Sequence, residues 1–192
     1  MPNSSLHAIV GLGNPGQEYA RTRHNAGFWF ADCLAAQHRG AFRMEPKFKA
    51  ELARIRIGDA DVLLLKPATF MNLSGESVQK LAQFYKLAPA DILIAHDELD
   101  LPAGSVRLKA GGGHGGHNGL RSLHQHLGAE YLRLRIGIGH PGNKDQVLDY
   151  VLGRPGKADE QLINDAIIAA TAAIPVWLAQ TWDKAVHQLH SS

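Results

Sequence analysis

The sequence predicts an α/β fold, a single domain in which helices flank both faces of a mixed, largely parallel twisted sheet. Short apolar runs alternate with segments of helical periodicity, and strands interleaved with helices favour a sheet of this kind. The length of 192 residues suits one packed unit, and no repeat or linker divides it. We therefore expect one domain over residues 1–192.

Six strands and four helices are predicted in chain order. The strands are His7–Leu12, Glu51–Ile57, Asp61–Lys66, Ile92–His96, Ser105–Lys109 and Tyr131–Ile138. The helices are Asn25–Gln37, Ser74–Tyr85, Asn118–Leu127 and Ala158–His187. The last helix has the clearest apolar stripe, which predicts core packing, and we expect Pro175 to kink it. The stripe consists of Ile163, Ile167, Ile174 and Leu178.

The composition is that of a globular protein, with 45% hydrophobic and 20% charged residues. Apolar runs such as Val62–Leu65 are far too short to span a membrane, and the N-terminal residues lack the basic and apolar stretches of an export signal. A lone Cys33 cannot form an internal disulfide, which agrees with a reducing compartment. We expect a cytoplasmic protein without a membrane segment.

The net charge of +2 is small for a protein that binds nucleic acid, so any such surface must come from local clusters of Lys and Arg. Strand periodicity predicts two clusters. Arg107 and Lys109 share one strand face, and Arg133 and Arg135 share another. For any one of them, the simpler interpretation is a solubilising surface charge.

Polar side chains follow three of the predicted strands. Asn14 follows the first strand, Asn72 lies in the loop after Val62–Lys66, and Asp97 directly follows Ile92–His96. If these strands are parallel, their carboxyl ends and the loops after them meet at one edge of the sheet. We therefore expect the three side chains at a shared rim.

His24 stands just before the helix predicted from Asn25, and an imidazole is the usual base that activates water near neutral pH. We assign Asp97 as its partner, because a carboxylate bonded to one ring nitrogen leaves the other free to accept a proton. The helix N-terminus favours the neutral ring and Asp97 favours the protonated ring, so the direction of the net pKa shift stays open.

This pattern suits hydrolysis of an ester by water. The attack creates an oxyanion, and the carboxamides of Asn14 and Asn72 can donate to it without adding a charge, although each Asn alone is more often a turn residue. No Ser lies in a G-x-S-x-G turn, and Cys33 falls inside a predicted apolar helix. A covalent nucleophile therefore has no good candidate.

Two glycine-rich segments allow other interpretations. Gly11–Gly16 matches the dinucleotide pattern G-x-G-x-x-G, with Asp32 near the position of a ribose-binding acid, but Pro15 lacks the amide N–H that a phosphate would need. Gly111–Gly119 lacks the Lys-Ser/Thr of a phosphate loop. It predicts close approach of a ligand to the backbone, or simply a surface loop in which Asn118 caps the next helix.

A metal hydrolase is a further alternative. Its potential ligands are His96, Asp97, Glu98, Asp100, His114 and His117. The two-residue gap between His114 and His117 lies in a glycine-rich loop and not on one face of a helix, which disfavours this alternative. We predict neither a metal nor a cofactor.

Six sequence blocks cover most of the chain. They are Val10–Tyr19, Thr22–Gly27, Thr69–Gly75, His96–Pro102, Gly111–Leu120 and Leu134–Pro141. In this order they resemble the bacterial peptidyl-tRNA hydrolase family, whereas the tail beyond Tyr150 matches more loosely. The resemblance implies a metal-independent, monomeric enzyme of translation and ribosome rescue that hydrolyses the ester between a peptide and tRNA.

The resemblance also implies roles for single residues. His24 would be the base and Asp97 would hold it in its accepting form, while Asn14 would help to distinguish N-blocked peptidyl-tRNA from aminoacyl-tRNA. Substrate contacts are implied for Tyr19, Phe70, Met71, Asn72 and Asn118, with Met71 lining the peptide groove. Contacts to the tRNA backbone near the acceptor stem are implied for Arg107, Lys109, Arg133, Arg135 and Lys144. A non-catalytic RNA-binding module on the same fold is the alternative, as chloroplast splicing-factor relatives suggest.

Overall fold

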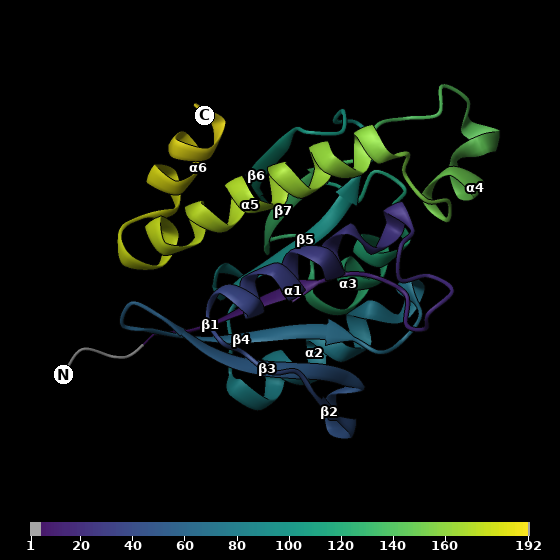
Figure 1. The fold of residues 1–192 in the computed structure, drawn as a ribbon. Helices are drawn as coiled ribbons and strands as arrows, with labels where there is room; N and C mark the ends of the chain where they lie inside the picture. The colour runs from purple at the N-terminus through teal and green to yellow at the C-terminus, as the bar shows by residue number, and fades with distance from the viewer. Residues whose placement is uncertain (1–4, 192) are drawn as a thin grey trace.

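A seven-stranded sheet runs through the computed structural model, which describes residues 5–191 (Figure 1). The strand order is β2-β3-β4-β1-β5-β7-β6. The strands are β1 Leu6–Gly11, β2 Arg43–Glu45, β3 Ala50–Ile57, β4 Ala60–Pro67, β5 Ile92–Glu98, β6 Val106–Ala110 and β7 Leu132–Gly137. Strands β4, β1, β5 and β7 are parallel. At one edge β3 pairs antiparallel with β4 and β2 pairs antiparallel with β3, and at the other edge β6 pairs antiparallel with β7. The predicted fold class is confirmed.

Helices cover both faces of the sheet (Figure 1). They are α1 Ala26–Gln37, α2 Ser74–Tyr85, α3 Asn118–Leu127, α4 Val147–Val151, α5 Lys157–Ala179 and α6 Trp182–His190. Helices α1, α5 and α6 pack on one face, and α2 and α3 pack on the other. Two short 3₁₀ turns matter for the site: η1 (Arg23–Asn25) precedes α1, and η3 (Met71–Leu73) precedes α2.

Alternate residues of the central strands enter the two cores. In β1, Ile9 is buried beneath α1 and α5, whereas Ala8 and Val10 are buried beneath α2 and α3. In β4, Leu64 joins the first core and Leu63 the second. Because both faces are covered, the central parts of these strands, Ala8–Val10 and Val62–Leu65, are apolar without alternation, as is usual in parallel strands.

The C-terminal segment differs from the prediction of one helix over Ala158–His187. It forms two helices, α5 and α6, separated at Gln180 and Thr181. The hydroxyl oxygen of Thr181 accepts the N–H of Lys184 and so caps α6, whereas Pro175 lies inside α5 and does not end it. The short elements β2 and α4 have no counterpart among the predicted elements.

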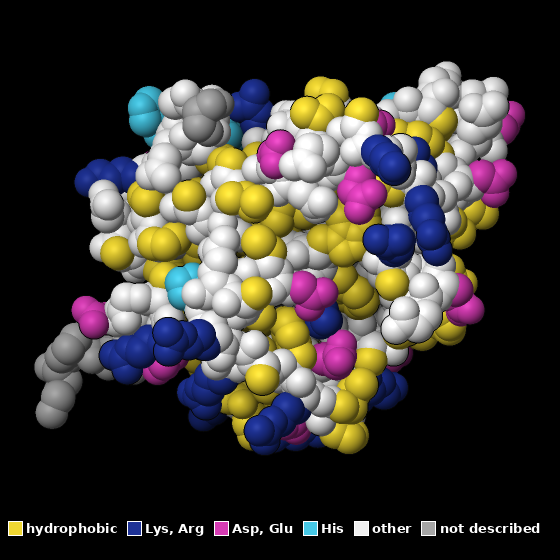
Figure 2. Space-filling view, in the orientation of Figure 1, with side chains coloured by type: hydrophobic (Ala, Val, Ile, Leu, Met, Phe, Trp, Pro, Cys, Tyr) yellow, Lys and Arg dark blue, Asp and Glu magenta, His cyan; other side chains and the backbone are white. Residues whose placement is uncertain are grey.

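Helix α5 has the length and apolar character of a membrane-spanning helix, which the sequence analysis did not anticipate. It has 23 residues and a mean hydropathy of 1.7 over its most apolar window. Its buried side chains, Ile163, Ile167 and Ile174 among them, belong to the core that α5 shares with α1 and the sheet. On the face that carries α5, charged side chains of both signs are scattered among apolar ones (Figure 2). We therefore describe α5 as a core helix.

Candidate active site

The loops after β1 and β4 and the end of β5 meet at one edge of the sheet. The side-chain oxygen of Asn14, after β1, accepts the backbone N–H of Met71, after β4, at 2.7 Å. Nδ1 of His24 lies 2.8 Å from Oδ2 of Asp97. Asp97 is part of β5 itself and does not follow the strand, contrary to the prediction. The structure thus brings His24 and Asp97 together at the predicted rim.

Close packing of α1 on the sheet places His24 beside Asp97. A Cβ atom on Gly27, in the first turn of α1, would lie 2.4 Å from the carbonyl oxygen of Ala95 in β5. One on Gly11 would lie 2.2 Å from the carbonyl oxygen of Gly27, and one on Gly13 would meet the ring of Phe28. The glycines at the start of the G-x-G-x-x-G pattern therefore admit a helix, which accounts for them without a dinucleotide.

Asn25 holds the backbone of Asn14 with both ends of its carboxamide. Oδ1 of Asn25 accepts the N–H of Asn14 at 2.9 Å, and Nδ2 of Asn25 donates to the carbonyl of Asn14 at 3.0 Å. The sequence analysis missed this residue, since an Asn at a helix start predicts a cap. Its side chain makes no capping bond to α1. Because Oδ1 of Asn14 is occupied by Met71, Nδ2 is the group of Asn14 that remains to donate to a substrate.

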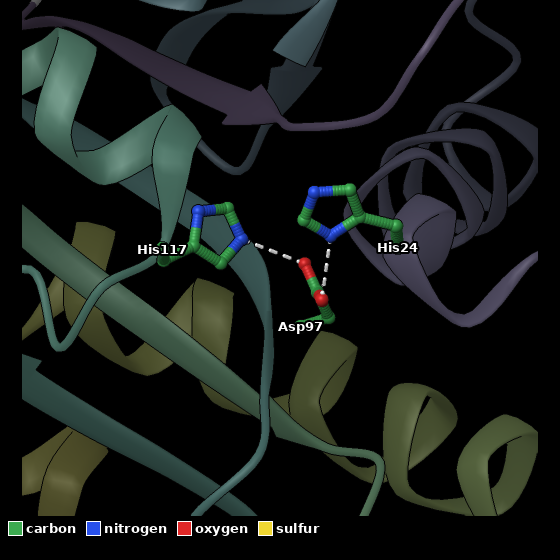
Figure 3. A group of neighbouring side chains, drawn as sticks. All are labelled: His24, Asp97 and His117. Atoms are coloured by element: carbon green, nitrogen blue, oxygen red, sulfur yellow. Dashed lines mark hydrogen bonds and ion pairs between the residues drawn. The ribbon is translucent and has the colours of Figure 1, made fainter. Parts of the chain in front are cut away.

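His117 is the second imidazole on Asp97 (Figure 3). Its Nε2 lies 2.7 Å from Oδ1 of Asp97, and its Nδ1 accepts the backbone N–H groups of Gly119 and Leu120. A nitrogen that accepts carries no proton, so the proton of His117 sits on Nε2 and is donated to Asp97. His117 is therefore the cap of α3, a role predicted for Asn118, whereas the sequence suggests His117 only as a metal ligand.

His24 keeps one ring nitrogen available for chemistry. Nδ1 donates to Asp97, which leaves Nε2 as the acceptor, and the residue is 8% exposed in the wall of a cleft. Burial lowers the pKa of His24, but the charge of Asp97 and the hydrogen bond to it raise the pKa more, so the net shift is upward. Burial also raises the pKa of Asp97, yet His24 and His117 together hold this pKa well below its usual range.

The cleft beside His24 has a volume of about 730 Å³. Its lining includes Lys109, Asn118, Arg135, His140, Lys144 and the loop from Gly113 to His117. Lys109, Lys144 and Asn118 are exposed, whereas Arg135 is partly buried and donates from Nε to Glu98 at 2.8 Å. Cations therefore line the same cleft as the His24 imidazole.

The predicted pairing of basic residues on β6 and β7 is present, but the members differ in exposure. Arg107 lies opposite Arg135 and Lys109 lies opposite Arg133, so all four occupy one face of this strand pair. Arg107 is exposed and is not among the residues that line the cleft. Arg133 is only 3% exposed, and its guanidinium donates to the carbonyls of Gly111 and Gly113. Arg133 is among the residues that line the cleft, but its side chain is 4% exposed, against 22% for Arg135.

The other implied substrate residues form a second group near Asn14. The rings of Tyr19 and Phe70 meet edge to face, with centroids 6.3 Å apart, and Phe70 is 56% exposed. Asn72 is exposed, whereas Met71 is 4% exposed and touches Gly119. None of these residues is among those lining the cleft with the cations. The site thus has a cationic side and an aromatic and carboxamide side.

His24, Asp97 and His117 are also spaced as metal ligands could be, with donor atoms within 4.8 Å of one another. One nitrogen of each imidazole lies at hydrogen-bond distance from Asp97. Nδ1 of His117 accepts a backbone N–H, which fixes the proton of this ring on Nε2. Of the other proposed ligands, His96 faces the Asp97 carbonyl and His114 accepts the N–H of Gly116. The hydrogen bonds suit a carboxylate that orients two neutral imidazoles better than a metal site.

The fold and this geometry define a class: a protein of α/β architecture with a mixed sheet, in which a histidine is held by a buried carboxylate at the edge where the parallel strands end. The model of the family described as peptidyl-tRNA hydrolase matches residues 8–192. The chain belongs to this family.

Individual relatives agree with the family match. A peptidyl-tRNA hydrolase of Neisseria meningitidis is 53% identical over 190 residues, which is 98% of this chain and 99% of the relative. One of Halorhodospira halophila is 54% identical over 184 residues, or 95% of each chain. The crystal structure of the peptidyl-tRNA hydrolase of Acinetobacter baumannii superposes with a TM-score of 0.94 at 49% identity, covering 97% of this chain and 95% of that one.

Proposed function

We propose that the protein hydrolyses the ester bond between a peptide and tRNA, with His24 as the base that activates the attacking water. The observation that carries the proposal is the hydrogen bond from Nδ1 of His24 to Asp97, which leaves Nε2 as an acceptor at the wall of the cleft. The names of the relatives supply the substrate, and the two sides of the site suit its two parts.

The proposed reaction needs one water and no covalent intermediate with the protein. Nε2 of His24 takes a proton from water as the oxygen attacks the ester carbonyl, and Asp97 stabilises the imidazolium that forms. The tetrahedral intermediate then collapses and the bond to the ribose oxygen breaks. His24 returns its proton to that oxygen, so free tRNA and the peptide acid leave and the base is restored; the acid then gives its proton to solvent and becomes a carboxylate.

Asn14 and Asn72 are the proposed donors to the developing oxyanion. The donor of Asn14 is Nδ2, because Met71 holds its oxygen and Asn25 holds its backbone. A donor fixed in advance stabilises the charge without reorganisation, which is the main source of rate in such sites. We also propose that Asn14 helps to recognise the N-blocked peptide.

The substrate is proposed to lie across both sides of the site. Lys109, Arg135 and Lys144 would contact the backbone of the acceptor stem in the cleft, with Arg107 at its margin. Tyr19, Phe70, Asn72 and Asn118 would contact the peptide and the terminal nucleotide, with Met71 beneath them. Contacts to the phosphates are independent of sequence, as an enzyme that accepts every tRNA requires.

The direct test is peptide release from N-blocked aminoacyl-tRNA by His24→Ala. We expect the rate to fall about 10²- to 10⁴-fold, the usual contribution of a general base, while tRNA binding persists. His187→Ala, at an exposed position in α6, is the matched control and should keep the wild-type rate. Near wild-type hydrolysis by His24→Ala would contradict the mechanism, and tight tRNA binding by a wild-type protein that releases no peptide would favour the RNA-binding alternative.

We further propose that the protein is one domain over residues 1–192 and acts as a cytoplasmic monomer, without a metal or a membrane. The single Cys33 and the packing of α5 against the sheet support this proposal. Light scattering during size exclusion should give the mass of one chain, 20.8 kDa. A mass of two chains, or loss of peptide release in the presence of a chelator, would contradict it.

A further inference from the structure

Arg133 is a buried cation that the proposed reaction does not use. Nη1 donates to the carbonyl of Gly113 at 2.8 Å and to that of Gly111 at 3.3 Å. Its Nη2 lies 4.0 Å from a carboxylate oxygen of Glu98, which supplies a countercharge. Burying a guanidinium costs free energy unless hydrogen-bond acceptors and a countercharge replace the water that it loses. The carbonyls of the loop and Glu98 supply this compensation for Arg133.

His96 connects the same guanidinium to the backbone of Asp97. Nδ1 of His96 donates to the Asp97 carbonyl at 2.8 Å, and its Nε2 accepts Nε–H of Arg133 at 3.4 Å. Burial, aided by the neighbouring His117 and Arg133, holds the pKa of His96 well below its usual value. The ring is therefore neutral and can accept from Arg133.

A second side chain holds the carbonyl between those two glycines. Nε2 of His124 in α3 donates to the carbonyl of Gly112 at 3.0 Å, and its Nδ1 accepts the hydroxyl of Tyr131 at 2.8 Å. Burial raises the pKa of Tyr131, so the phenol keeps the proton that it donates. Three successive carbonyls, Gly111 to Gly113, are thus fixed by side chains of β7 and α3.

The path of this loop requires glycine where it passes Arg133. Gly112 has a φ of +108°, and a Cβ atom there would lie 2.8 Å from Cε of Lys109 and 3.1 Å from Nη1 of Arg133. Four residues after Gly113 the chain reaches His117, which donates to Asp97. Arg133 therefore acts on Asp97 from two directions, through His96 to its backbone and through the loop and His117 to its carboxylate.

We propose that Arg133 is a positioning residue for the hydrolysis and not a contact to tRNA: by fixing Gly111 and Gly113 it sets where His117 meets Asp97. This inference rests on the proposed function. The planar guanidinium of Arg133 donates from Nε to His96 and from Nη1 to the loop carbonyls at once, in a fixed geometry that a Lys ammonium cannot reproduce. Supporting groups of this kind hold reacting groups to within about 0.5 Å of the productive geometry.

The test compares the same substitution at two positions of β7, Arg133→Gln and Arg135→Gln, in peptide release and tRNA binding. We expect Arg133→Gln to lower kcat about 10²-fold, the effect of a displacement near 1 Å, and to leave the salt dependence of tRNA binding unchanged. Arg135→Gln should instead raise KM and reduce the salt slope by about one. The opposite assignment of the two effects would overturn the proposal.

Arg133→Lys separates geometry from charge. A positioning role predicts that Lys restores little of the lost kcat, whereas a phosphate contact would be largely rescued by the retained charge. In these variants the midpoint of the acidic limb of the pH profile should move upward, because Asp97 loses the donor of His117 and binds protonated His24 more strongly. An unchanged midpoint together with wild-type kcat would contradict the inference.

A measurement on the wild-type protein covers the case in which the Arg133 variants do not fold. Deacylated tRNA is titrated into ¹⁵N-labelled protein, and the Nε–H signals of the arginines are followed. The Arg135 signal should shift, and the Arg133 signal should stay, since Nε–H of Arg133 faces His96. Equal shifts would overturn the inference.

If His24→Ala is inactive but Arg133→Gln keeps its kcat, the inference alone fails; if the wild-type protein releases no peptide, the proposed function fails.

Discussion

The two oxygens of Asp97 each receive one imidazole donor, and only one of these donors can change its tautomer. His117 must donate from Nε2, because its Nδ1 accepts two amides of α3. Nδ1 of His24 makes no other hydrogen bond within residues 5–191, so its proton depends on Asp97 alone. Asp97 thus decides whether Nε2 of His24 can accept a proton from water.

Asp97→Asn should therefore invert the tautomer of His24. The new carboxamide has one oxygen and one NH₂ group, and His117 can only donate, so the oxygen turns to His117 and the NH₂ group turns to His24. Nδ1 of His24 then becomes an acceptor and Nε2 carries the proton, which blocks the base. We expect kcat to fall about 10³- to 10⁴-fold with tRNA binding retained, measured by peptide release.

A control for this prediction is the thermal unfolding of the same variant, because a collapsed site would also lose activity. NMR of the imidazole nitrogens should report a protonated Nε2 and an unprotonated Nδ1 at His24. If that spectrum still showed the proton on Nδ1, the explanation by tautomer would be wrong, whatever the loss of rate.

The pH dependence of the wild-type rate follows from the raised pKa of His24. The base works only when neutral, so kcat/KM should rise with pH and reach its plateau above the pKa of His24, with a midpoint above the ordinary value of 6.5. The stabilisation from the His24 and Asp97 ion pair has the opposite dependence. It is complete below 6.5 and is lost as the pH rises through the higher folded pKa. A midpoint below 6.5 in peptide release would contradict the assignment.

Much of the site could be predicted from single residues and their place after strands. His24, Asp97 and Asn14 carry chemistry that is visible in their side chains, and parallel strands bring the loops after them to one edge. Asn25 and Arg133 act through hydrogen bonds to backbone groups distant in sequence, and His117 acts through a hydrogen bond to the distant carboxylate of Asp97. No local pattern encodes such bonds. The direction of the His24 pKa shift also required the structure, since it depends on burial and on a distance.

At the scale of elements, the sequence patterns predicted the bounds of a helix or strand correctly where the element is long and its own side chains determine where it begins and ends. The bounds of α2 and α3 match the prediction, because each begins and ends at strong local signals. Strand β2 has three residues and is defined only by pairing with β3, and α4 has five residues. Such short elements form where tertiary contacts support them, so their sequences carry little signal.

The junction between α1 and the sheet yields a stability prediction. Gly27→Ala would place a Cβ atom 2.4 Å from the carbonyl oxygen of Ala95 and 2.5 Å from the amide nitrogen of Leu12, both backbone atoms that cannot move aside locally. Overpacking of this kind costs ~1–3 kcal/mol of unfolding free energy and would shift His24 away from Asp97. Urea unfolding should show the loss, with a larger fall in kcat than in tRNA affinity.

Gly113→Ala is the control for this experiment. A Cβ atom there meets nothing within 4 Å, so its unfolding free energy should stay within ~0.5 kcal/mol of the wild type. Equal destabilisation by the two substitutions would show that close packing of α1 is not what makes Gly27 necessary.

For the molecule as a whole, the net charge and the composition predict less about function than the positions of the charged and apolar residues in the fold. The net charge is only +2, and α5 is apolar enough for a membrane by composition, yet it packs in the core. Of the cations of the cleft, Lys109 lies on β6 and Arg135 on β7, at one end of the strand order, while β2 and β3 occupy the other end. The positive surface that we propose for tRNA is thus local, which explains why composition alone could not predict it.

A local surface predicts that removing one positive charge has different effects at different places on the molecule. Lys109→Gln removes an exposed cation from the cleft, whereas Arg54→Gln removes an exposed cation from β3 at the far end of the sheet. Without one phosphate contact, the slope of log affinity against log salt concentration should be smaller by about one. Fluorescence anisotropy with labelled deacylated tRNA should show that reduction for Lys109→Gln only. Equal slopes for the two variants would mean that tRNA responds to net charge, and the cleft would then not be the binding surface.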